Sequence, residues 1–132
     1  MGSAGPLPRA KDRIAQHAGQ LMTLCRFHAV ARISDIAPGE VKHTDVAGHE
    51  IAVYNIGGEF FATSDRCTHK RARLSDGYVD GGVVECPLHF GKFDIRTGRV
   101  LSPPCKINLA VYPVRVLDGA VLVGDAAGAA AI

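Results

Sequence analysis

Two Cys-His pairs constrain the fold of this chain more than any other sequence feature. The first pair is Cys67-x-His69, the second is Cys86-x2-His89, and sixteen residues separate them. Thiolates and imidazoles bind zinc and iron–sulfur centres in preference to magnesium or calcium. If the four side chains bind one centre, the fold must bring two separate loops together.

The composition is that of one ordinary globular domain. The chain has 132 residues, of which 47% are apolar, enough to bury a core without help. A formal net charge of +2 gives no argument for a nucleic-acid partner. No apolar run approaches the roughly 20 residues of a membrane helix, and the N-terminal sequence lacks the apolar stretch of a secretory signal. We therefore expect a cytoplasmic protein, monomeric on its own, that binds neither nucleic acid nor membrane.

From Phe27 onward, short β-rich runs alternate with turn residues. Before the Cys-His region the runs are HAVARI, VKHTDV, EIAVYNI and FFATSD, separated by APGE, AGH and GGE. After that region VVECP, KFDI, RVL, VYPVRVL and AVLVG continue the pattern. The sequence predicts an all-β domain of antiparallel strands, either a sandwich or a small barrel.

The two ends of the chain differ from this β-rich body. Residues 1–25 form an N-terminal extension with an apolar stripe at helical spacing: Ile14, Ala18, Leu21, Met22 and Cys25. The stripe predicts a short amphipathic helix whose apolar face packs on the domain. Residues 125–132 are mostly small and predict a flexible tail, which leaves residues 26–124 as the folded domain.

The four cysteines divide into two groups. Cys25 and Cys105 lie outside the pairs, and we expect each to be a small buried side chain. Spacings that include histidine favour metal binding over disulfides. The common zinc finger pairs cysteine with cysteine and histidine with histidine, whereas each pair here is mixed. Mixed pairs suit a two-iron cluster with two cysteines on one iron and two histidines on the other. A structural zinc site stays open as the alternative.

The motifs CTHxxARLSDG and ECPLHxGxFDxRTG resemble the Rieske ferredoxins of bacterial aromatic-ring-hydroxylating dioxygenase systems. The resemblance extends over about residues 27–124 and includes IAVYNIGGEFFATSDRC and VYPVRVLDGAVLV. It implies a Rieske fold, with stacked antiparallel sheets and a small cluster-binding subdomain at about residues 66–107. It also implies one [2Fe-2S] cluster, held by Cys67 and Cys86 on the inner iron and His69 and His89 on the outer iron.

The resemblance implies an electron carrier of aromatic hydrocarbon catabolism and not an enzyme. Such a ferredoxin takes single electrons from an NAD(P)H-dependent flavin reductase and passes them to a terminal oxygenase. The chain is too short to contain the oxygenase's catalytic domain as well, with its iron site of two histidines and one carboxylate. A small Rieske subunit of a larger reductase, of the nitrite reductase type, is the alternative from the same cofactor class.

Four positions predict where the reduction potential lies. Rieske proteins of respiratory chains carry a disulfide and two hydroxyl donors near the cluster, which raise the potential. In our alignment this chain has Ala72 and Leu88 in place of those cysteines, and Gly91 and Phe93 in place of the donors. We therefore expect a potential at the low end of the Rieske range of about −150 to +300 mV.

Charged and proline residues beside the pairs carry two further hypotheses. The family commonly has glycine after the first ligand histidine, whereas this chain has Lys70. Lys70, Arg71 and Arg73, with Lys92 near the second pair, form either a solvated charged face or a docking surface for an acidic partner. Pro103 and Pro104 resemble the proline-bearing loop that covers the cluster in this family.

Overall fold

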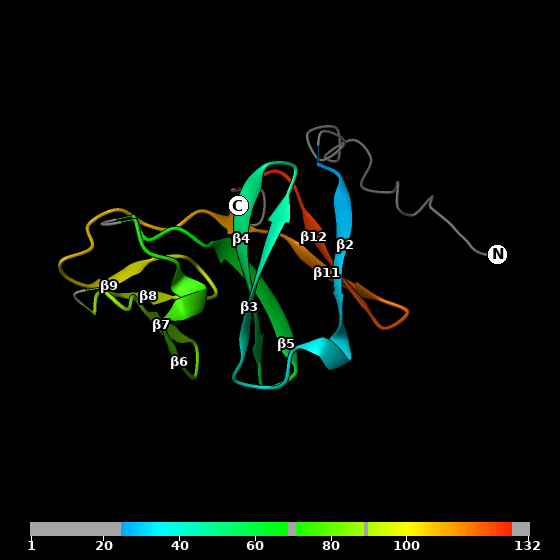
Figure 1. The fold of residues 1–132 in the computed structure, drawn as a ribbon, viewed down its shortest axis with the longest axis horizontal. Coiled ribbons are helices and arrows are strands. Elements are labelled where there is room, and N and C mark those ends of the chain that lie inside the picture. The colour runs from blue at the N-terminus through cyan, green and yellow to red at the C-terminus, as the bar shows by residue number, and fades with distance from the viewer. Residues whose placement is uncertain (1–24, 69–70, 89, 128–132) are drawn as a thin grey trace.

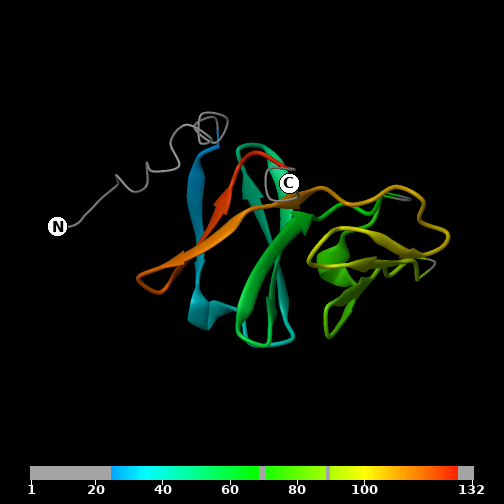
Figure 2. The ribbon, with the colours of Figure 1, turned by 180° about the vertical axis from the view of Figure 1, so that it is seen from behind.

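The computed structural model describes residues 25–68, 71–88 and 90–127. It consists of antiparallel strands in three sheets, which confirms the all-β prediction. Two sheets lie together in one half of the molecule and the third forms the other half (Figures 1 and 2). The predicted N-terminal helix falls almost entirely in residues 1–24, outside the described ranges. None of the helices within those ranges has the length and hydrophobicity needed to cross a membrane.

The strand orders and residue bounds of the three sheets and two short helices are as follows. The first sheet has the order β10-β5-β4-β3, with strands Val111–Tyr112, Glu59–Ser64, His49–Ile56 and Val41–Val46. The second has the order β11-β12-β2, with strands Val114–Leu117, Ala120–Gly124 and Phe27–Arg32. The third has the order β6-β7-β8-β9, with strands Tyr78–Asp80, Val83–Glu85, Lys92–Asp94 and Val100–Ser102. Two 3-10 helices are η2 (Ile33–Asp35) and η3 (Leu74–Asp76).

We call the first and second sheets the base. We call the third sheet, η3 and the loop of residues 103–109 the cap. The cap lies at one end of the base, and the chain enters it after β5 and returns to the base at β10 (Figure 1).

Three two-residue turns set the register of the base hairpins. The turns are Ala47-Gly48 (φ 49° and 87°), Gly57-Gly58 (63° and 100°) and Asp118-Gly119 (50° and 79°). Positive φ at both central residues is the signature of a type I′ turn, whose twist matches that of the flanking strands. These turns join β3 to β4, β4 to β5 and β11 to β12.

Strand β4 is buried on both faces. Its residues Ile51 to Asn55 are all buried, whereas a strand with one solvent face would alternate. Ile51 and Val53 belong to the core between the two base sheets, which we call the base core. Ala52 and Tyr54 point the other way and belong to the core beneath the cap, which we call the cap core. The cap therefore packs on the face of the first sheet that the second sheet leaves open.

The predicted runs agree with the observed strands, with two differences. The run VYPVRVL divides into β10 and β11 at Pro113, which has no N–H to donate to a ladder. The chain crosses from the first sheet to the second at this residue. Strand β6 was not predicted, because its three residues include no buried side chain to mark a pattern.

Candidate cluster-binding site

The two predicted ligand cysteines lie in two loops that are closed in the same way. Cys67 follows β5, and its N–H donates to the carbonyl of Ala72 over 2.9 Å. Cys86 follows β7, and its N–H donates to the carbonyl of Gly91 over 2.8 Å. In both loops the acceptor stands five residues after the cysteine. The N–H of each cysteine thus forms the hydrogen bond that closes its own loop, and the two cysteines occupy equivalent positions in the two loops.

Both cysteines are buried in the cap core. Cys67 and Cys86 are in one cluster of buried side chains with Leu74, Val84 and Phe93. The N–H of Leu88 points at Cys86 Sγ over 3.4 Å. Backbone N–H groups that donate to ligand sulfurs stabilise thiolates and tune iron–sulfur centres. These buried surroundings therefore suit a metal centre that is shielded from water and bound by cysteine sulfurs on the side facing the cap core.

Burial raises the pKa values of two thiols in the cap core, those of Cys86 and Cys105. Burial raises the pKa of Cys86 to about 11, against the lowering effect of the Leu88 N–H. Burial, and then contact with Cys67, raise the pKa of Cys105 to about 12. A metal ligand has to be a thiolate, so Cys86 would lose its proton if it bound iron as predicted.

The structure describes only part of the predicted ligand set. It brings Cys67 and Cys86 into one core. His69, Lys70 and His89 lie outside the described residues. The ligand roles of all four residues, Cys67, His69, Cys86 and His89, therefore stay predictions.

Cys105, expected only to be buried, is also in contact with the first ligand loop. Its Sγ lies 3.8 Å from Cys67 Sγ. It also packs on Gly91 so closely that a Cβ at that position would lie 2.3 Å from Cys105 Sγ. Glycine at position 91 is thus required by the loop of residues 103–109, which we call the third loop because it lies beside the two ligand loops. The sequence signal for Cys105 was its place directly after Pro103 and Pro104, the predicted cover.

The loop that carries these prolines is tied to the first ligand loop. Thr68 Oγ1 donates to the carbonyl of Ile107 over 2.7 Å. The Pro103-Pro104 peptide is cis, Pro103 is exposed and Pro104 is half-buried. Two side chains of this loop, Cys105 and Leu109, enter the cap core.

The FDxRTG motif is a turn that docks the third loop. Asp94 Oδ2 accepts from Thr97 Oγ1 over 2.6 Å and from the Thr97 N–H over 3.2 Å. Gly98 has φ 77°, and a Cβ there would lie 2.3 Å from the carbonyl oxygen of Leu109. The Leu109 N–H donates to the Gly98 carbonyl over 2.7 Å. Gly98 is therefore needed both for its backbone conformation and for this close approach.

A buried carboxylate joins the cap to the base, and the sequence did not single it out. Asp65, at the end of β5, is fully buried. Its Oδ2 lies 2.6 Å from Nδ1 of His43 on β3 and accepts from Ser75 Oγ over 2.6 Å. Its Oδ1 accepts from the Ser75 N–H over 2.7 Å. The LSDG part of the first motif is thus the place where η3 is bonded to the base.

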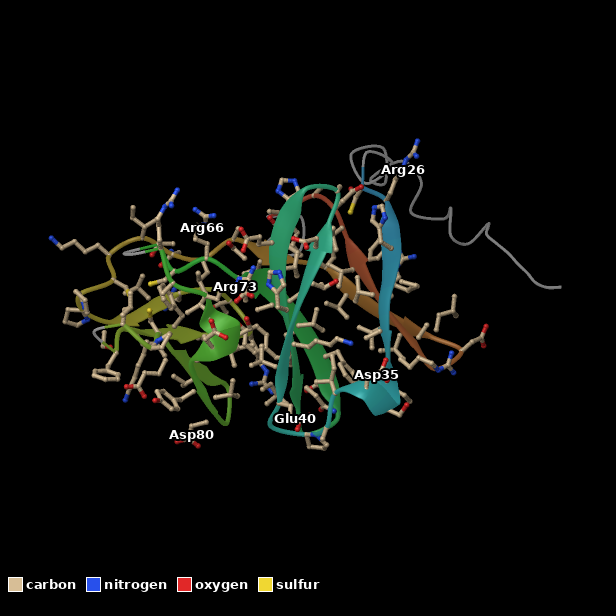
Figure 3. The ribbon with its side chains drawn as sticks, viewed as in Figure 1. Arg26, Asp35, Glu40, Arg66, Arg73 and Asp80 are labelled. Atoms are coloured by element: carbon tan, nitrogen blue, oxygen red, sulfur yellow. The ribbon has the colours of Figure 1, made fainter. Side chains whose placement is uncertain are left out.

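The predicted basic residues differ in their surroundings. Arg66 and Arg73 share Glu50, at 3.1 Å to its Oε2 and 3.5 Å to its Oε1 respectively. The hydrogen bond from Arg66 lowers the pKa of Glu50. Figure 3 shows Arg66 and Arg73 close together where the cap meets the first sheet. Within the described residues, neither Arg71 nor Lys92 forms an ion pair.

Exposed apolar side chains accompany these charges. Leu88 and Phe90 flank the second predicted ligand histidine and are 45% and 56% exposed. Ile107, in the loop bonded to Thr68, is 65% exposed. Phe90 also has φ 57°, an unusual conformation for a bulky residue. The sequence pattern indicated the charges near the ligand loops but not this apolar surface.

The donor chemistry fits a Rieske cluster, and comparisons with known proteins agree. Residues 26–113 match the model of the Rieske [2Fe-2S] domain family. Over 95 residues the chain is 47% identical to the ferredoxin component of a naphthalene 1,2-dioxygenase system from Pseudomonas putida, which covers 72% of this chain and 90% of that protein.

Solved structures give the same result. The complex of reduced oxygenase and oxidised ferredoxin in carbazole 1,9a-dioxygenase contains a chain with a TM-score of 0.71 and 43% identity, covering 74% of this chain and 91% of that one. A chain assigned as the small subunit of an NADH-dependent nitrite reductase from Mycobacterium tuberculosis has a TM-score of 0.70 over 77% of this chain and 96% of its own. Its identity is 22%, so this likeness concerns the fold alone.

These matches decide between the alternatives that the sequence left open. A mixed Cys-His set in a Rieske domain binds an iron–sulfur cluster, so the structural zinc site is set aside. This chain belongs to the Rieske [2Fe-2S] family, as a ferredoxin of the aromatic-ring dioxygenase type that binds one such cluster and carries electrons without being an enzyme.

Proposed function

We propose that this protein carries single electrons from an NAD(P)H-dependent flavin reductase to a terminal ring-hydroxylating oxygenase. The observation that carries the proposal is the 47% identity to a dioxygenase ferredoxin over 90% of that protein. The carbazole dioxygenase complex of oxygenase and ferredoxin supports the second half of this route. In this proposal the protein acts in the cytoplasm as a monomer that meets its two partners in turn.

Four residues hold the cluster in this proposal. Cys67 and Cys86 bind the inner iron, and His69 and His89 bind the outer one. Burial of both cysteines and the Leu88 N–H at Cys86 Sγ support the inner pair. When bound, the cluster takes up and releases one electron, at a higher potential than four thiolate ligands would give. The protein keeps the two sulfurs dry and fixes both loops through the N–H bonds of the cysteines.

The third loop covers the cluster in this proposal. Pro103 and Pro104 reduce the freedom of the backbone at the start of the loop. The hydrogen bond from Thr68 to Ile107 fixes the far side of the loop against the first ligand loop. A cover that is already rigid keeps water from the inner sulfurs without ordering on each turnover.

The assembly of the cluster is the first test. Purified protein should be red-brown, contain equal amounts of iron and acid-labile sulfide, and give, when reduced, the low average g value of histidine-ligated clusters by electron paramagnetic resonance. It should then be reduced by a flavin reductase with NAD(P)H and reoxidised by an oxygenase in stopped-flow absorbance. A colourless zinc protein would contradict the cluster, and a stable one-to-one complex with a reductase subunit in gel filtration would favour the nitrite reductase alternative.

The potential should lie at the low end of the Rieske range. The four positions that lack respiratory-type donors are Ala72, Leu88, Gly91 and Phe93, and none carries a hydroxyl or a thiol. Phe93 is fully buried and Gly91 is covered by Cys105, and neither residue supplies a hydroxyl donor. Protein-film voltammetry measures the midpoint, and a reversible value well above zero would contradict this part of the proposal.

The partners dock on the exposed apolar and basic surface around the ligand loops. Leu88, Phe90 and Ile107 supply apolar area, as the centres of protein interfaces do. Lys70, Arg71, Arg73 and Lys92 supply positive charge that steers an acidic partner. Arg73 contributes less than the others because it shares Glu50 with Arg66.

Charge reversal tests the docking surface. The double variant Lys70→Glu/Arg71→Glu should slow electron transfer with a partner by about tenfold or more at low salt, because charge steering acts on the association rate. The difference should shrink at high salt, where exposed charges are screened. Lys42→Glu, an exposed reversal on β3 of the base, is the matched control. Unchanged rates with unchanged salt dependence in the double variant would rule out the basic part of the surface.

A further inference from the structure

The sulfur of Cys105 is in contact with the sulfur of Cys67. The two sulfurs are 3.8 Å apart and both side chains are buried, each with 3% of its surface exposed. They lie 38 residues apart in the chain, on the first ligand loop and on the third loop. A neighbouring hydrogen bond holds the two loops together at this contact, because Thr68, beside Cys67, donates to the carbonyl of Ile107 in the third loop.

The position of the Cys105 side chain is fixed by packing. Its Sγ and Cβ lie over Gly91 of the second ligand loop, in space that any larger residue at position 91 would fill. Leu109 and Phe93 belong to the same buried cluster. Cys105 thus contacts both ligand loops and has little room to turn its sulfur away from Cys67.

The direction of the hydrogen bond follows from the chemistry of the ligand. A cysteine bound to iron is a thiolate and can only accept, so a thiol at 3.8 Å from it can only donate. Hydrogen bonds to cluster sulfurs stabilise the more negative, reduced form and raise the reduction potential. The thiol is a weaker donor than a hydroxyl, which is consistent with a modest effect.

We propose that the Cys105 thiol donates a hydrogen bond to the Cys67 sulfur and thereby raises the midpoint potential of the cluster. This inference rests on the proposed ligand role of Cys67. It assigns to the third loop an electronic role in addition to its role as a cover. Ala72, Leu88, Gly91 and Phe93 lack the donors of respiratory Rieske proteins, and Cys105 supplies a weaker one from a different direction.

Two substitutions separate hydrogen bonding from packing. Cys105→Val fills the space of the thiol without a donor, and Cys105→Ser keeps a donor in a smaller side chain. We expect the valine variant to lower the equilibrium constant for reduction by about threefold to tenfold, where tenfold corresponds to about 59 mV for a one-electron couple. The serine variant should stay at or above the wild-type potential. Protein-film voltammetry of the loaded proteins gives all three values.

The outcomes are separable from failure of the proposed function. If wild-type protein lacks the cluster or its histidine-type resonance, the proposed function fails before any variant is compared. If the cluster is present but the wild-type and valine potentials coincide, or if serine falls together with valine, the hydrogen bond is refuted. Should Cys105→Val fail to assemble, Cys105→Ala removes the donor without adding atoms and must give the same lowered potential. Cys25→Ala, in the base, should leave the potential unchanged.

Discussion

The base core and the cap core share strand β4 but differ in how each is held together. The base core consists of Ile36, Val46, Ile51, Val53, Ala62, Tyr112, Val121 and Val123, from both base sheets. The cap core contains three cysteines, and the strands above it are each three residues long. Strands this short form few ladder bonds. The base is thus a scaffold that apolar packing holds together, and we expect the cap to gain part of its stability from metal binding.

Loss of a predicted ligand cysteine should have the largest effect. It should remove the cluster from the cap and leave the base sheets folded. We expect Cys86→Ser to remove the cluster, because a serine hydroxyl does not replace the inner thiolate. Iron and acid-labile sulfide per chain should fall close to zero, while far-UV circular dichroism retains the signal of the base sheets. Cys25→Ser, next to Gly124 in the base, should keep full cluster content. A fully loaded Cys86→Ser protein would contradict the ligand assignment.

A matched pair of core truncations sharpens the comparison. Ile51 in the base core and Ile95 in the cap core are both fully buried. Each change to alanine should cost about 2–5 kcal/mol of local stability. In a urea titration of Ile95→Ala, bleaching of the cluster should precede the loss of circular dichroism, since only the cap is weakened. In Ile51→Ala the bleaching of the cluster and the loss of circular dichroism should both shift together to lower urea concentrations, because the cap packs on the base. Identical profiles for the two variants would show that base and cap unfold as one unit.

Weakening the junction between base and cap should have a smaller effect than the core truncations. Asp65→Asn weakens the bonds to His43 and Ser75, and hydrogen bonds to a charged group contribute about 1.5–3 kcal/mol. We expect faster loss of the cluster on warming, followed by its visible absorbance. Asp45→Asn removes the exposed carboxylate whose Oδ1 lies 3.8 Å from His43 Nε2, and it should change little. Equal rates in the two variants would refute the role of Asp65 as the junction.

The smallest effect concerns the edge of the base, far from the cap. The hydrogen bond from His28, 3.0 Å away, and one from the Arg26 N–H lower the pKa of Asp125. The folded form thus favours the carboxylate, so this stabilisation is present above the ordinary Asp value of 3.8 and is lost as the pH falls through the lower folded value.

The thermal midpoint measures this pH dependence. Wild type should exceed Asp125→Asn in Tm at neutral pH, and the difference should shrink as the pH falls below 3.8. Asp118→Asn, at the β11–β12 turn, should show no such trend. A Tm difference for Asp125→Asn that grows in acid would contradict the assignment.

Much of the fold could be predicted because its signals are local. The runs VKHTDV and AVLVG coincide with β3 and β12, since alternating β-rich residues end at turns with positive φ. The family, its fold and its cofactor were implied by the resemblance of the two motifs to Rieske ferredoxins, and the comparisons confirm them. The short strand β6 escaped because three residues carry too little pattern.

The site was predicted less completely than the fold. The sequence singled out the two Cys-His pairs, and the structure brings their cysteines into one core. It did not predict that Asp65 would bond to Ser75, because the two lie ten residues apart on different elements. It also grouped Arg73 with the docking charges, without the information that Glu50 on β4 faces it.

By itself the sequence determined the residue types and spacing of the predicted ligands, the turns, and the alternation that makes the strands. These features act within a few residues, where backbone and side-chain preferences dominate. Only the tertiary structure decided that β4 is covered on both faces and that Cys105 lies against Cys67 across 38 residues. Contacts of this kind depend on how whole sheets and loops pack on one another, and no local pattern in the chain encodes that packing.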